Sequence, residues 1–133
     1  MYAVIPVALS LVLAQASPEQ PSIEGRWINP DRSVIVDVAP CETALCGTVQ
    51  WATEQAQQDA RKGTPTLIGT QILTGLQQEG AVWKGKLFVP DQNLRAEAKI
   101  ESDGQQLKVS GCVLGICKSQ LWVRSDGPLP AQD

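Results

Sequence analysis

Short runs of alternating apolar and polar residues are the feature of this chain that most constrains its fold. In residues 94–101, LRAEAKIE, every second side chain is apolar and the others are charged. The same period of two recurs in residues 34–38, 83–89 and 107–113. Because successive side chains of a strand point to opposite faces of a sheet, such runs are typical of strands with one buried and one solvated face. The pattern favours an antiparallel sheet.

Turn residues divide the chain into eight predicted strands. Pro, Gly, Asn and Asp separate most of the alternating runs, and two cysteine-bounded segments separate the others. The predicted strands cover residues 23–29, 33–39, 46–52, 67–77, 81–89, 93–101, 105–113 and 117–124. Eight strands joined mainly by tight turns predict an all-β fold, an antiparallel up-and-down barrel whose closure removes exposed edges. A two-sheet β-sandwich is the alternative.

One connection, residues 53–65, is long and polar and has no strand character. Its Gln, Ala, Glu and Arg content allows one or two helical turns. In a simple meander, successive turns alternate between the two ends of the barrel. The turns after the first, third, fifth and seventh strands therefore share one rim, which would gather residues 29–32, 53–65, 90–92 and 113–116.

The first 16 residues, MYAVIPVALSLVLAQA, carry no charge and end in an Ala-x-Ala sequence. Such a segment is typical of a secretory signal peptide with its cleavage site, and the apolar run is short for a membrane span. We therefore expect a periplasmic or secreted protein with no stable membrane insertion after cleavage. Residues 17–22 would form a loose segment, 23–124 a single barrel domain and 125–133 a flexible, Pro-rich tail.

The four cysteines form two pairs with the same spacing. Behind an export signal, four cysteines indicate two disulfides, for which three connectivities exist. The spacing favours the local pairs Cys41–Cys46 and Cys112–Cys117, because cysteines flanking a four-residue hairpin loop would lie on facing strand ends. A zinc site is the alternative, although it needs reduced thiols and usually a closer spacing.

The second cysteine-bounded ring contains Val113, Leu114 and Ile116 where a turn is expected. Solvent-facing turns normally use Gly, Asn, Asp or Ser, which satisfy the backbone locally. Large apolar side chains that stay exposed do not contribute the favourable free energy that their burial would give. We therefore expect the 53–65 segment, a ligand or a partner protein to cover this ring.

The composition excludes several kinds of chemistry. The chain has no histidine, so it has no Ser-His-Asp triad, Cys-His pair or imidazole metal site. Oxidised cysteines leave no thiolate nucleophile, and no phosphate-binding or Ca²⁺-binding motif is present. The net charge is −3 and the charges are scattered, which argues against nucleic acid as a partner. We expect no enzymatic activity, no metal and no cofactor.

The first predicted strand carries Gly25-Arg26-Trp27, and the last ends at Arg124. This arrangement resembles the lipocalin and calycin superfamily, in which a G-x-W on the first strand packs near an arginine that ends the last one. The resemblance implies a contact between Trp27 and Arg124 at the barrel end away from the shared rim.

Residues 25–124 more specifically resemble the bacterial domain-of-unknown-function 2147 family. The matching stretches are GRWINPD, CETALCGTVQW, LIGTQILTGL, VWKGKLFVPD and LKVSGCVLGICKSQLWVR. The resemblance implies an exported barrel of lipocalin type with no established activity, so it transfers no catalytic residue. The chain departs from the family in 53–65, where many members carry an Asp and an Asn-Pro-Asp motif.

For an exported barrel of this kind, we expect a binding module for a small apolar or amphipathic molecule. Trp27, Trp51 and Trp83 fall on inward positions, where they either fill the core or stack on a ligand. The predicted ligand-lining residues are Trp51, Leu87, Val89, Leu94, Ala96, Val113, Leu114 and Ile116. One alternative is a protein-binding barrel, such as a periplasmic inhibitor of a protease or lysozyme, and another is a structural envelope protein.

Overall fold

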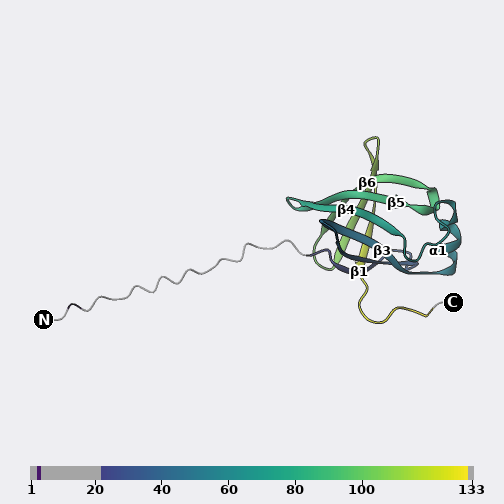
Figure 1. The fold of residues 1–133 in the computed structure, drawn as a ribbon, viewed down its shortest axis with the longest axis horizontal. Coiled ribbons are helices and arrows are strands. Elements are labelled where there is room, and N and C mark those ends of the chain that lie inside the picture. Colours follow the sequence, from purple (N-terminus) through teal and green to yellow (C-terminus); the bar gives the residue numbers. More distant parts are fainter. Residues whose placement is uncertain (1–2, 4–21, 132–133) are drawn as a thin grey trace.

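The structure, a computed structural model, describes residue 3 and residues 22–131. Within these residues the chain forms a closed barrel of eight antiparallel strands in meander order (Figure 1). The strands are β1 (Gly25–Ile28), β2 (Val34–Cys41), β3 (Ala44–Ala52), β4 (Gln71–Glu79), β5 (Val82–Val89), β6 (Leu94–Ser102), β7 (Gln106–Val113) and β8 (Ile116–Arg124). The predicted barrel is confirmed and the sandwich alternative is wrong. Apart from residue 3, the predicted signal peptide lies outside the described residues.

Three short helical segments lie in the connections: α1 (Glu54–Asp59), η1 (Ala60–Lys62) and η2 (Pro90–Gln92). Helix α1 begins after Thr53, whose hydroxyl oxygen accepts a hydrogen bond from the Ala56 amide at 3.1 Å. The helical turns expected in residues 53–65 are therefore present. No helix in the described part of the chain has the length and apolar character needed to cross a membrane.

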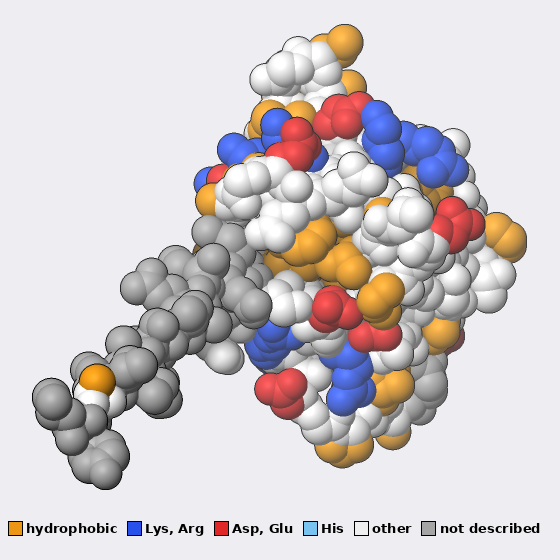
Figure 2. Space-filling model, turned by 60° about the vertical axis from the view of Figure 1, so that its left-hand side comes forward, with side chains coloured by type: hydrophobic (Ala, Val, Ile, Leu, Met, Phe, Trp, Pro, Cys, Tyr) orange, Lys and Arg blue, Asp and Glu red, His pale blue; other side chains and the backbone are white. Residues whose placement is uncertain are grey.

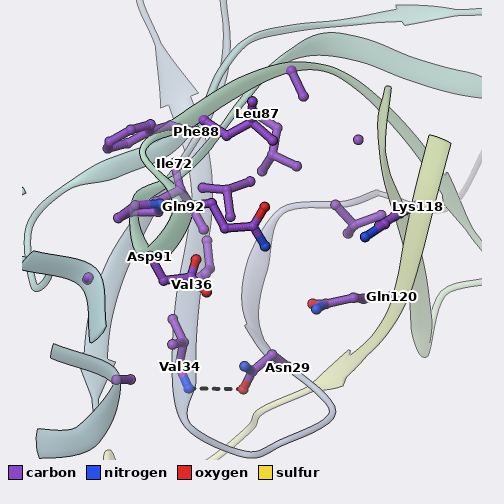
Figure 3. A pocket seen from close by; sticks show the side chains of 18 of the residues that line it. Asn29, Val34, Val36, Ile72, Leu87, Phe88, Asp91, Gln92, Lys118 and Gln120 are labelled. Atoms are coloured by element: carbon purple, nitrogen blue, oxygen red, sulfur yellow. Dashed lines mark hydrogen bonds between the residues drawn. The ribbon is translucent and has the colours of Figure 1, made fainter. Parts of the chain in front are cut away.

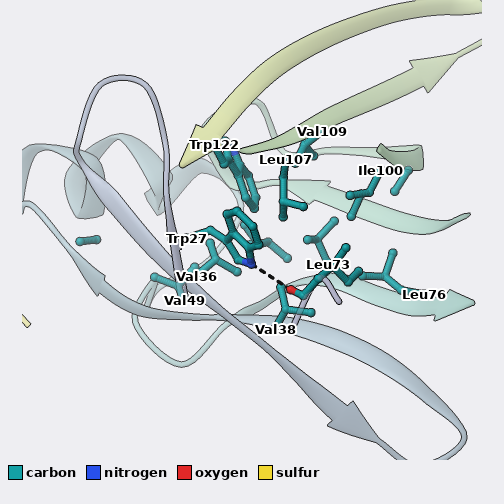
Figure 4. Close-up of a cluster of buried hydrophobic side chains, with 14 of the residues drawn as sticks. Trp27, Val36, Val38, Val49, Leu73, Leu76, Ile100, Leu107, Val109 and Trp122 are labelled. Carbon is teal, nitrogen blue, oxygen red and sulfur yellow. Dashed lines mark hydrogen bonds between the residues drawn. The ribbon is translucent and has the colours of Figure 1, made fainter. Parts of the chain in front are cut away.

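Apolar side chains from strands all around the barrel fill one end of its interior (Figure 4). The period of two places them there, because each strand turns alternate residues inward. Among the most deeply buried of these residues are Trp27, Val38, Leu73, Leu76, Ile100 and Leu107. Their burial supplies the main driving force for folding.

Arg124 joins the last strand to the first at this filled end. Its guanidinium lies over the Trp27 ring, with the carbon 3.9 Å from the ring centroid. The same group donates hydrogen bonds to the carbonyl oxygens of Gly104, at 3.1 Å, and Ser22, at 2.9 Å. Arg124 therefore links β8 to the segment before β1 and to the β6–β7 turn. The contact implied by the sequence is confirmed.

Gly25 explains why a glycine precedes this tryptophan. Its φ is +117°, and a Cβ at this position would lie 2.6 Å from an Arg124 guanidinium nitrogen. A side chain there would be strained by the backbone and would also displace the arginine. The G-x-W sequence is thus a steric requirement of the arginine contact.

The β6–β7 turn presents the Gly104 carbonyl to Arg124. One carboxylate oxygen of Asp103 accepts hydrogen bonds from the backbone amides of Gln106, at 2.7 Å, and Gln105, at 3.0 Å. These amides, Gln106 first, hold the pKa of Asp103 below its ordinary value. A depressed folded-state pKa stabilises the fold at pH values above the ordinary aspartate pKa. That contribution is lost as the pH falls through the lowered value.

Both local disulfides are confirmed. Cys41 is bonded to Cys46 with a Cα–Cα distance of 5.8 Å, and Cys112 to Cys117 with a distance of 4.1 Å. The prediction of four-residue loops is wrong, because the strands extend into the segments between the cysteines and leave only two residues in each turn. In the second turn these are Leu114 and Gly115, both with positive φ, as the twist of a tight hairpin requires.

Replacement of Arg124 by Ala should lower the free energy of unfolding by about 1–3 kcal/mol, because stacking and the packing of the side-chain stem are both lost. Chemical denaturation of the full chain measures this. Arg95→Ala is the matched control, since Arg95 stacks on Phe88 at 4.3 Å on an exposed position and should cost less. Equal losses in the two variants would contradict a closing role for Arg124.

Candidate ligand-binding cavity

The connections after β1, β3, β5 and β7 lie around one cavity, as the meander geometry predicts. The first connection lines the cavity with Asn29 and Asp31, and the second with Ala56, Asp59 and Ala60. The third connection contributes η2 and the fourth the β7–β8 turn. This rim is opposite the turn that holds Arg124, because successive turns of a meander alternate between ends.

The cavity has a volume of about 640 Å³, within the usual range of about 300–1,000 Å³ for small-molecule sites. Val36, Val49, Val109 and Trp122 belong both to its lining and to the buried core. They form its floor, above the filled end of the barrel. The interior is therefore packed at one end and hollow at the other.

Most of the residues predicted to line a ligand site do line this cavity. They are Leu87, Val89, Leu94, Ala96, Val113, Leu114 and Ile116. They come from β5, β6 and the β7–β8 hairpin, where the period of two is regular. Their contact with a ligand stays a prediction.

Trp51 does not line the cavity, so its predicted inward position is wrong. It packs with Ile28 and Ile35 in a small cluster separate from the main core. The β2–β3 register shifts between Ile35 and Val36. This irregularity lets Val49 face inward while Trp51, only two residues later, faces the opposite side. Alternation counted along β3 alone cannot detect it.

A polar wall on β8 is not among the features predicted from the sequence. Figure 3 shows Lys118 and Gln120 pointing into the cavity across from Gln92. The Trp122 indole nitrogen donates to the Gln120 side-chain oxygen at 3.1 Å, which leaves the amide hydrogens of Gln120 available to a guest. The period of two along β8 was a signal for this wall, because it places Lys118 and Gln120 on the same inward face as Trp122.

Lys118 is the basic residue of the cavity lining, whereas Asp31, Asp59 and Asp91 supply carboxylates. Among the described residues, the salt bridges are Lys86 with Glu97 and Lys99 with Glu101, so Lys118 is not in an ion pair. The lining thus combines an apolar floor with charged and amide groups nearer the rim. Such a site suits an amphipathic molecule better than a purely apolar one.

The apolar ring at the tip of the β7–β8 hairpin is not covered, contrary to expectation. Leu114 is 98% exposed and Ile116 is 72% exposed. The hairpin projects beyond the barrel, above β6 in Figure 1, so the 53–65 segment does not reach over it. That segment packs against η2 instead.

Gly63 permits this packing of η1 against η2. Its φ of −118° suits any residue, but a Cβ would lie 2.6 Å from the Pro90 carbonyl oxygen. The glycine is therefore needed for close approach and not for its backbone conformation.

Gly63→Ala should detach the 53–65 segment from η2 because the added methyl group meets the rigid Pro90 backbone. We expect faster hydrogen exchange in residues 54–63 and 90–93, measured by mass spectrometry, with the β-strands protected as before. Lys62→Ala, at an exposed neighbouring position, is the control and should leave exchange unchanged. Unaltered exchange in Gly63→Ala would show that the segment is not held by this contact.

The described residues contain no cluster of three or more His, Cys, Asp or Glu side chains able to hold a metal ion. All four cysteines are disulfide-bonded.

The barrel and its one-ended cavity define a small all-β protein of the kind that can enclose a guest molecule. A family model described as "Uncharacterized protein conserved in bacteria (DUF2147)" matches residues 25–124. The match extends from the glycine of the G-x-W sequence to Arg124. The chain belongs to this bacterial family. No curated protein and no solved structure matches it.

Proposed function

We propose that the protein is an exported, non-catalytic binding module for a small amphipathic molecule. The apolar part of the guest would lie on the floor formed by Val36, Val49, Val109 and Trp122. Its polar part would lie near Lys118, the side-chain amide of Gln120 and the amide of Gln92.

The observation that carries this proposal is the hollow end of the barrel. A chain that needed only a stable core could fill both ends, yet Ala96 and Gly111 occupy inner positions beside the cavity. The small side chain of Ala96 leaves part of the cavity open, whereas Gly111 makes room for Leu87, because a Cβ at Gly111 would lie 2.9 Å from a Leu87 methyl carbon. The other end shows that this sequence can pack a barrel interior densely.

An exported location is consistent with the disulfides. Two disulfides fit an oxidising compartment, since they form and persist outside the cytosol. The periplasm is the compartment we propose. A binding role there accords with the absence of histidine from the chain and with the charged groups lying near the cavity rim, where they would contact a guest.

Filling the cavity should weaken binding without unfolding the barrel. We propose Ala96→Phe, because Ala96 lies on the cavity wall and the added ring occupies the space of the guest. Titration with anilinonaphthalene sulfonate, an amphipathic fluorescent probe, should show affinity reduced by about tenfold or more. Thermal denaturation monitors the fold.

Lys99→Phe is the matched control, because Lys99 lies on the same strand but is exposed. It adds the same ring outside the cavity and should leave probe affinity unchanged. Equal probe binding by Ala96→Phe and the unaltered protein, with both folded, would place the probe elsewhere and contradict the proposal.

A further inference from the structure

Strand β8 is longer than the strand that closes the barrel against it. It has nine residues, whereas β1 has four. The two strands pair only at Trp27 with Arg124 and Ile28 with Val123. Residues 116–121 therefore have a strand neighbour on one side, β7, and none on the other.

Three residues of this stretch direct their backbone groups toward the free side. The pair Val113–Ile116 closes a two-residue turn, so it is a hydrogen-bonded pair, and pairs alternate from there. Cys117, Ser119 and Leu121 then occupy non-hydrogen-bonded positions. The Cα–Cα distance of 4.1 Å between Cys112 and Cys117 agrees with this assignment. Within the described residues, no other backbone group pairs with the N–H and C=O groups of these three.

The tip of the same hairpin is apolar and fully accessible. Figure 2 shows it as a knob at the top of the view that ends in hydrophobic atoms. Leu114 adopts a φ of +51°, which is unfavourable for a leucine and normally given to Gly or Asn. Neither burial within the chain nor turn propensity accounts for a leucine at this position, which is 98% exposed.

We propose that a second copy of this chain pairs with the free edge of β8, antiparallel and about a two-fold axis through Ser119. The register places Ser119 opposite Ser119 of the partner subunit, and Cys117 opposite Leu121 of the partner subunit. All these pairs are of the hydrogen-bonded kind, which gives about six backbone hydrogen bonds between the copies.

A second copy, unlike an arbitrary peptide, accounts for the free edge and the apolar tip together. In this register Ile116 comes opposite Trp122 of the partner subunit. Leu114 extends to the place where the partner's β1 ends. The partner strand runs in the direction of β1, because both are antiparallel to β8, and it continues the sheet where β1 stops.

The charges along the edge are compatible with self-pairing. Residues 116–121 carry a single charged side chain, Lys118. The two-fold register places it opposite Gln120 of the partner subunit, so like charges are not directly opposed.

The test is the oligomeric state of the full chain together with a directed cross-link. Light scattering coupled to size exclusion should give twice the mass of one chain. The variant Ser119→Cys should form an intermolecular disulfide under mild oxidation, identified by peptide mapping. Lys108→Cys, on an exposed position of β7 away from the edge, is the control and should stay uncross-linked.

Ser119→Pro should convert the dimer to a folded monomer that shows a cooperative thermal unfolding transition. Proline removes an N–H that the barrel itself does not use, so pairing with β7 persists. Should this variant fail to fold, the cross-link still decides. A monomer at every soluble concentration, or no enrichment of the Ser119→Cys cross-link over the control, would overturn the proposal.

Discussion

The stacking of Arg124 on Trp27 is the interaction on which this barrel depends. The two strands that meet there share only two residue pairs, fewer than any other neighbouring strands in the barrel. Backbone hydrogen bonds alone therefore join β1 to β8 over only a short length. The Arg124 guanidinium strengthens this junction by donating hydrogen bonds to carbonyl oxygens before β1 and in the β6–β7 turn. Gly25 and the turn at Asp103 are both shaped to admit it.

The shortness of β1 leaves β8 without a neighbour toward the other end of the barrel. The same end of the barrel holds the cavity. The two features use different groups of β8, because the side chains of Lys118 and Gln120 line the cavity while the backbone of Ser119 faces the free edge.

Much of the fold could be predicted from the sequence. Alternation in residues 83–113 fixed strand positions and most of the cavity lining, because these strands pair without irregularity. Trp51 was misplaced because a register shift between two strands leaves no trace in either strand alone. The exposure of Leu114 was also missed. Apolar residues predict burial. How far the β7–β8 hairpin projects beyond the barrel depends on the strand pairing, which the sequence alone does not show.

The most direct test of the account is native mass spectrometry of the full chain, exported and purified from the periplasm without denaturation. The account predicts an added small-molecule mass that denaturation removes and that Ala96→Phe does not retain. Detection of only the bare protein mass, in the unaltered chain and in the variant alike, would contradict a guest-binding cavity.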